Sequence, residues 1–283
     1  MGLELEELVG KSAEDLRKSD QVRLDTSFYI LGFVGILWTL FWVFWHKEEP
    51  AQSKSISKEE LTFIHTHREI GQNSDAIETS FWSGFQNKNL WYLLGMYICY
   101  AIGAYFFQSW FHTYLQKGRN ISADALMWAS SVPYLLAALG CFTGGWLSDK
   151  ACLKWGKKWG RRIVPMSGLF VAGICIIGAS LVENNMLAII ALAIGMAFMD
   201  VTAPVAWAVA MDLGGDKSGT VSGSMNSAGL TGAYFSTILF GYLASNFGYY
   251  LPVLFIGIMV LLGAFVWLKI DATQKIEFTA KNK

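Results

Sequence analysis

Residues 186–211 read MLAIIALAIGMAFMDVTAPVAWAVAM, an apolar run that contains one acid, Asp200, and no lysine or arginine. A helix needs about 20 apolar residues to cross the hydrocarbon core of a bilayer, so this run is long enough to span a membrane. Pro204 has no N–H to bond the carbonyl of Asp200, which predicts a kink there. The stretch therefore indicates a kinked membrane-spanning helix with an ionisable group near its middle.

Six further runs of the same kind lie on either side of this one. Each lacks Asp, Glu, Lys and Arg, and they cover residues 27–45, 89–116, 125–148, 163–182, 220–246 and 251–268. The 283-residue chain is 53% apolar and 16% charged, against about 25% charged residues in a soluble domain. We therefore predict an all-α membrane protein with seven transmembrane helices.

The segments between the runs define the expected domain organisation. Residues 1–26 form a polar N-terminal tail, 46–88 a central loop, 89–268 a six-helix unit and 269–283 a C-terminal tail. The segments 46–88, 149–162, 212–219 and 269–283 carry most of the 22 basic residues. Since loops rich in Lys and Arg stay in the cytoplasm, we expect the C-terminus inside and the N-terminus outside.

Charge and motifs exclude several classes of function. Lys plus Arg and Asp plus Glu both number 22, so no net charge favours nucleic acid as a partner. The sequence contains no His-Glu-x-x-His, Gly-x-Ser-x-Gly or Gly-x-x-x-x-Gly-Lys-[Ser/Thr] motif of hydrolases and nucleotide-driven motors. We expect no enzyme activity, no cofactor and no metal site. A membrane transporter or a receptor remains.

Asp200 is the most informative single residue. An ionisable side chain inside a span is costly unless it faces a polar cavity or a partner, so it marks a candidate functional site. Thr202, Pro204 and Trp207 follow it, and a kink, a hydroxyl and an indole beside an acid predict a cavity wall. The alternative, that Asp200 bonds a neighbouring helix only for structure, stays open.

Two other patterns suggest moving or tightly packed helices. Asp149 ends one span while Arg161 and Arg162 precede the next, and an ion pair between the acid and either arginine would form a gating latch. The positive-inside rule alone also accounts for these basic residues. Gly140 and Gly144, like the small residues at every fourth position of 220–246, predict close approach of helix backbones.

Several stretches are similar to one known family. They read FYILGFVGILW at 28–38, QSWFHTYL at 108–115, GWLSDK at 145–150, MDVTAPVAWAVAMD at 199–212 and GTVSGSMN at 219–226. From about residue 25 onward the chain resembles helices 6–12 of the major facilitator superfamily, specifically its anion:cation symporters of sugar acids. The fold implied is one helix plus the C-terminal six-helix half of a major facilitator.

The resemblance implies a secondary active transporter of organic anions such as galactonate, glucarate or hexuronates. Transport would be proton-coupled, by alternating access, in a bacterial inner membrane. Tyr97, Trp207 and Asn226 match substrate-site positions, although galactonate-binding relatives carry Gln where Tyr97 stands. We add the in-span polar residue Gln108 as a substrate contact and Asp200 as a polar element that takes up the proton.

Part of the family's site has no counterpart in this sequence. The basic residue that pairs with the substrate carboxylate, and the acids that carry the proton, lie on the family's first and fourth helices. No predicted span here contains Lys or Arg. We therefore expect an N-terminally truncated transporter that needs the missing helices for a full site. The alternative is a non-transporting membrane remnant or a partner subunit.

Overall fold

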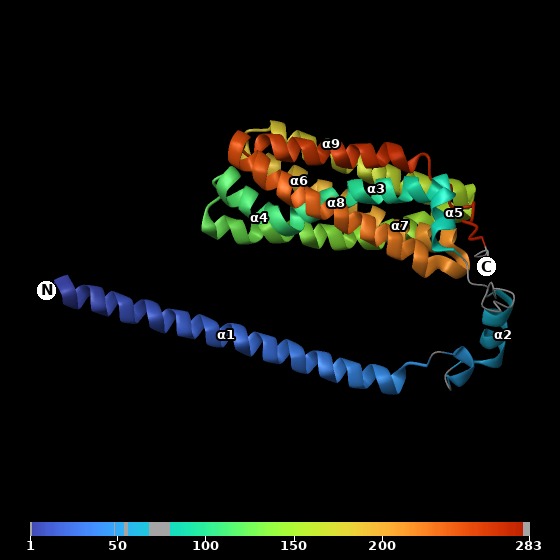
Figure 1. Ribbon diagram of the computed structural model, residues 1–283, viewed down its shortest axis with the longest axis horizontal. Coiled ribbons are helices and arrows are strands. Elements are labelled where there is room, and N and C mark those ends of the chain that lie inside the picture. The colour runs from blue at the N-terminus through green and yellow to red at the C-terminus, as the bar shows by residue number, and fades with distance from the viewer. Residues whose placement is uncertain (1, 48, 54–55, 68–79, 280–283) are drawn as a thin grey trace. The chain divides into compact units, whose positions relative to one another are not determined.

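The computed structural model describes residues 2–47, 49–53, 56–67 and 80–279, which fold into helices and their connections (Figure 1). The chain divides into two compact units, Met1–Gln72 and Asn73–Lys283. The first unit contains α1 (Gly2–Trp45), a short 3₁₀ turn (Pro50–Gln52) and α2 (Lys58–His67). The predicted span 27–45 is thus the second half of a longer helix, because the polar residues before it are also helical.

The second unit is a bundle of helices joined by short connections. After a 3₁₀ turn at Phe81–Gln86, its helices are α3 (Lys88–Tyr105), α4 (Phe111–Thr113), α5 (Ala123–Leu181), α6 (Asn185–Asp200), α7 (Thr202–Gly214), α8 (Ser218–Phe247) and α9 (Tyr250–Trp267). Side-chain caps begin two of them, since Asn87 accepts a hydrogen bond from the Asn89 N–H and Asn184 from the Leu187 N–H. Two π-helical turns flank α4, at Phe106–Trp110 and Tyr114–Gly118.

The long helix α5 is two antiparallel spans joined by a tight turn. Gly156 has φ +78° and ψ 162°, a backbone conformation that residues other than glycine rarely adopt. The chain reverses its direction at this residue. Ser148 accordingly meets Gly160, with its hydroxyl 3.3 Å from the carbonyl oxygen. The two halves of α5 correspond to the predicted spans 125–148 and 163–182.

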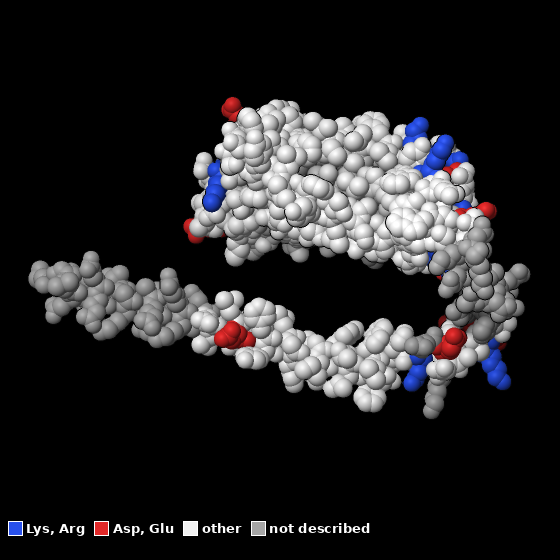
Figure 2. Space-filling model, viewed as in Figure 1, with Lys and Arg blue, Asp and Glu red and all other residues white. Residues whose placement is uncertain are grey.

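The described helices confirm the predicted all-α membrane fold. Among the described residues, five helical segments are long and apolar enough to cross a membrane, and two of them, Ala123–Leu181 and Asn185–Phe247, have 59 and 63 residues. Each of these two is long enough for two crossings, and each corresponds to two of the predicted spans. Figure 2 shows charged side chains at the two ends of the second unit and a surface without Lys, Arg, Asp or Glu between them.

Glycines bring helix backbones together inside the bundle, as the small-residue spacing predicts. An added Cβ at Gly140 would lie 2.0 Å from the carbonyl oxygen of Ala197, and one at Gly144 would lie 2.3 Å from that of Val201. On α8, a Cβ at Gly229 would lie 2.7 Å from the Tyr97 ring. These contacts hold α5 against the end of α6, and α8 against α3.

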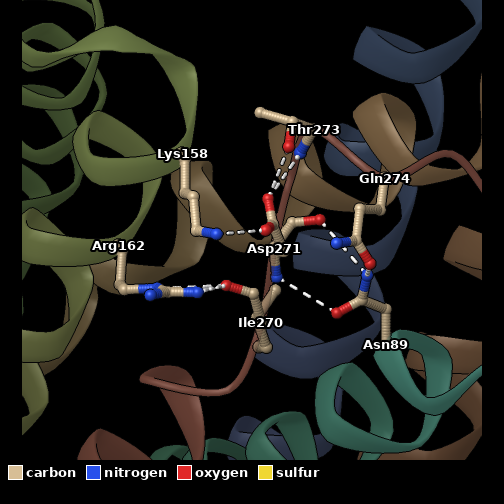
Figure 3. A network of polar contacts seen from close by, with 7 residues as sticks. All are labelled: Asn89, Lys158, Arg162, Ile270, Asp271, Thr273 and Gln274. Carbon is tan, nitrogen blue, oxygen red and sulfur yellow. Dashed lines mark hydrogen bonds and ion pairs between the residues drawn. The ribbon is translucent and has the colours of Figure 1, made fainter.

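The segment after α9 packs on the bundle. A polar network joins it to α3 and to the second half of α5 (Figure 3). Lys158 lies 2.6 Å from the Asp271 carboxylate, Arg162 donates two hydrogen bonds to the Ile270 carbonyl, and the Asn89 side chain bonds both the N–H and the C=O of Asp271. Further along, the Ile276 N–H donates to the Leu213 carbonyl at the end of α7. The described part of the predicted C-terminal tail, residues 269–279, therefore packs on the second unit.

The contacts of Asp271 are expected to make part of the free energy of unfolding sensitive to acid. Burial acts to raise the pKa of its carboxyl, but the Lys158 ammonium and two hydrogen bonds from Thr273 outweigh burial, so the pKa lies below its usual range. A lowered pKa stabilises the fold above about pH 3.9, the usual value for an unfolded chain, and this contribution disappears as pH falls through the folded-state pKa.

Asp271→Asn is therefore expected to cost about 1–2 kcal/mol at pH 7, allowing for the half-exposed Lys158, and to flatten the stability profile at acid pH. Denaturant titrations of the chain in micelles between pH 2.5 and pH 7 measure both effects. Asp216→Asn, at an exposed acid of the α7–α8 turn, is the matched control. An acid limb that remains in the Asp271 variant would contradict this assignment.

Candidate functional site

Asp200 lies at a break between two helices of the second unit. α6 ends at Asp200 and α7 begins at Thr202, so one predicted span is two helices that meet at a kink. Pro204 lies in the first turn of α7 and lacks the N–H that would bond the Asp200 carbonyl. The kink predicted from Pro204 is therefore present, and Gly144 and Gly145 of α5 pack beside it.

Two tyrosines of α3 connect Asp200 to the neighbouring helix. The Tyr100 hydroxyl donates a hydrogen bond of 2.9 Å to an Asp200 carboxylate oxygen. Tyr97, one turn earlier, stacks on Tyr100 with ring centroids 5.4 Å apart and an angle of 29° between the rings. Both tyrosines are 9% exposed, so the acid and the two phenols form a polar cluster in an apolar bundle. Such a cluster combines a proton-binding group with hydroxyl donors.

Trp207 completes this cluster and Thr202 does not belong to it. The Trp207 side chain, 38% exposed, lies beside the Tyr97 hydroxyl. Thr202 is fully buried, and its hydroxyl lies 3.3 Å from the carbonyl oxygen of Pro165 in α5. The prediction that Thr202 shares a cavity wall with Asp200 is thus wrong, because the break after Asp200 turns the hydroxyl toward α5.

Gln108 and Asn226 occupy exposed positions on other elements. Gln108 lies in the π-helical turn Phe106–Trp110, where the Phe111 N–H bonds the Phe106 carbonyl instead of that of Phe107. π-helical turns are frequent at functional sites. Asn226 is on α8, one turn before the glycine that packs on the Tyr97 ring. The structure therefore brings Asp200, Tyr97 and Trp207 together, while no hydrogen bond among the described residues joins Gln108 or Asn226 to that cluster.

The structure distinguishes between the two arginines named for a latch. An Arg161 nitrogen lies 2.8 Å from the Asp149 carboxylate, and its Nε lies 3.5 Å from Asp212 at the end of α7. Lys157 also contacts Asp212, at 2.8 Å. Arg162 instead binds the Ile270 carbonyl, 108 residues away. Arg161 therefore joins three spans at one end of the bundle, and Arg162 anchors the segment after α9.

Tyr100 is the site residue that sequence reasoning did not single out. It lies three residues after Tyr97, which places both on one face of α3. This spacing could have indicated that Tyr97 and Tyr100 belong to the same site. No local feature of the sequence indicates that this face of α3 contacts Asp200, 100 residues later.

A bundle of apolar helices with a polar cluster at a kink defines a multi-pass membrane protein with an intramembrane polar site. The chain belongs to the Major Facilitator Superfamily, whose family model matches residues 19–237 and again residues 154–283.

Curated relatives within this superfamily are transporters. A probable sulfoacetate transporter of Cupriavidus necator is 26% identical over 253 residues, 89% of this chain and 58% of the relative. A D-galactonate transporter of Escherichia coli is 27% identical over 84% of this chain and 57% of the relative, and a hexuronate transporter of Bacillus subtilis is 25% identical over 78% and 51%. The chain thus spans little more than half the length of these relatives.

Proposed function

We propose that this chain forms the C-terminal half, with one preceding helix, of a secondary transporter of organic anions such as sugar acids. The observation that carries the proposal is the cluster of Asp200, Tyr100, Tyr97 and Trp207 at the α6–α7 break. An acid inside a span is costly to desolvate, so its presence marks a candidate functional site. The names of the curated relatives, which include sulfoacetate, galactonate and hexuronate transporters, support the class of substrate.

Each group of the cluster suits one part of such a substrate. The rings of Tyr97 and Trp207 offer stacking surfaces and hydrogen-bonding groups for a sugar acid's hydroxyls. Asn226 of α8 and Gln108 of the π-helical turn Phe106–Trp110 would add amide groups. Asp200 would take up the coupling proton, with Tyr100 holding its carboxylate in place. These side chains bind the uncharged part of the substrate.

The carboxylate of the substrate needs a cation that these helices do not carry. None of the spans 89–116, 125–148, 163–182, 186–211, 220–246 and 251–268 contains Lys or Arg. An anion at midplane depth requires a positive partner, because isolated charges are costly in a bilayer. We propose that helices outside this chain supply that cation, so that the full site forms between two halves, near the midplane.

Arg161 would act as the latch of alternating access. It contacts Asp149, which is exposed, and Asp212, which is mostly buried, so exchange between two acids is geometrically available. The basic residues at this end would place it in the cytoplasm, with the N-terminus of the chain outside and the protein in a bacterial inner membrane. Rocking of the helices would break the Asp149 pair and re-form it.

Uptake by proteoliposomes tests the proposal. We expect no uptake of labelled galactonate, glucuronate or sulfoacetate by the chain alone. A fusion should behave differently. It joins this chain to the N-terminal part of the Escherichia coli D-galactonate transporter, the part that lies before the region similar to this chain, and it is expected to take up at least one of the three anions. Uptake by the chain alone would refute the requirement for additional helices. If a folded fusion takes up none of the three anions, a non-transporting remnant or partner subunit is the better interpretation.

A further inference from the structure

An apolar groove opens on the bundle between the two halves of α5 and the end of α6. Its volume is about 370 Å³. Apolar side chains from all three segments line it, among them Leu147, Ala151, Ile163, Val164, Phe198 and Val201. Leu147 and Phe198 are each 43% exposed, so the groove faces outward from the second unit. In a membrane protein such a surface is in contact with lipid chains or with another helix.

Two lysines line the same groove. Lys150 and Lys154 lie one turn apart on α5, near the charged end of the bundle. The Lys150 ammonium is 3.9 Å from the centre of the Trp146 ring, and the Lys154 ammonium is 5.2 Å from that of Trp155. Tryptophan is enriched where a span meets the headgroup layer, so the indoles place the lysines at headgroup depth.

These lysines differ from the other basic residues of the segment 149–162. Lys157, Lys158 and Arg161 form ion pairs with acids, and Arg162 binds a backbone carbonyl. Within the described part of the chain, Lys150 and Lys154 have no acidic partner. Two positive charges are thus held beside aromatic rings at the open edge of an apolar groove, and no acid that the structure describes forms an ion pair with them.

We propose that this groove is a binding site for an anionic phospholipid. One acyl chain lies along the apolar floor, and the phosphate sits between Lys150 and Lys154. Basic pockets between transmembrane helices on the cytoplasmic side are suited to anionic headgroups, and a groove alone would accept neutral lipids equally well. The site lies on α5 and α6 and is independent of the transport proposal.

Lipid titration of the full chain in micelles, followed by native mass spectrometry, tests this site. Phosphatidylglycerol is expected to bind more tightly than phosphatidylcholine of the same chain length. K150Q/K154Q is expected to weaken phosphatidylglycerol binding roughly 25-fold, since each of the two lysines near an anionic surface contributes a factor of about five. Lys217→Gln, an exposed lysine at the α7–α8 turn, is the matched control and should change nothing.

Two further variants distinguish the contribution of the lipid headgroup from that of the acyl chain. The charge-conserving variant also controls for misfolding. K150R/K154R keeps both charges and should retain phosphatidylglycerol binding. Ser167→Phe places a ring in the groove, where Ser167 is exposed, and should weaken both lipids.

Three results would overturn the proposal. The first is equal affinity for phosphatidylglycerol and phosphatidylcholine, which would mean that the lysines select no headgroup. The second is unchanged phosphatidylglycerol binding in K150Q/K154Q or in Ser167→Phe, which would place the lipid elsewhere. The third is displacement of phosphatidylglycerol by soluble glycerol phosphate as effectively as by the lipid, which would show a phosphate site without an acyl site.

Discussion

Gly140→Ala is expected to destabilise the folded chain by about 3 kcal/mol, the upper end of the cost of inserting one extra carbon into a packed core. The added Cβ would lie 2.0 Å from the carbonyl oxygen of Ala197. That oxygen belongs to the backbone of α6, so no change of side-chain rotamer relieves the clash, and α5 must move away from α6. Denaturant titration in micelles, followed by circular dichroism, measures the loss.

Gly178→Ala provides the matched control in the same helix. An added Cβ at Gly178 meets nothing within 4 Å. Alanine favours a helix over glycine by about 1 kcal/mol, so this variant is expected to be neutral or slightly more stable. Equal destabilisation by Gly140→Ala and Gly178→Ala would show that the effect is not due to the α5–α6 contact. The α5–α6 contact also flanks the break at Asp200, so the Gly140 variant should disturb the polar cluster.

In the fusion with the Escherichia coli segment, Asp200→Asn is expected to reduce uptake about tenfold or more and to remove the pH dependence of uptake. A tenfold loss of uptake corresponds to about 1.4 kcal/mol, and one hydrogen bond to a charged group contributes about 1.5–3 kcal/mol. Asparagine keeps the shape and polarity of the side chain but cannot exchange a proton. Uptake of labelled substrate between pH 5 and pH 8 measures both effects, and the unfolding midpoint reports the fold separately.

Tyr100→Phe tests the partner of this acid. It removes the hydroxyl that bonds Asp200 and leaves the ring stack with Tyr97 in place. We expect reduced uptake with pH dependence retained, because the titratable group remains. Tyr234→Phe, at an exposed position of α8, is the control. If both site variants unfold more easily and transport normally, Asp200 is structural, as the alternative interpretation holds.

Local features of the sequence were sufficient to predict the spans and the kink. Uncharged runs such as 251–268 predict helices because transfer free energies of neighbouring residues add along the chain. Pro204 predicts the break after Asp200 because its missing N–H affects the same helix four residues earlier. The spacing of Gly140 and Gly144 predicts a close helix contact, although it does not name the partner.

The partners of the polar side chains could not be predicted from local sequence. Thr202 bonds Pro165 and not the cluster, Arg162 bonds Ile270 and not Asp149, and Tyr100 bonds Asp200. Each partner lies between 37 and 108 residues away in the sequence, so no local pattern identifies it. Each pair depends on which faces of two different elements meet in the bundle.

The sequence by itself therefore determined which segments enter the membrane, where one of them breaks and where an acid is placed inside it. Only the tertiary structure decided that Asp200 faces two tyrosines, that Arg161 lies between two acids and that Lys150 and Lys154 have no acidic partner among the described residues. The physical reason is range. Hydropathy and helix breaking act over a few neighbouring residues, whereas hydrogen bonds and ion pairs depend on which helix faces meet.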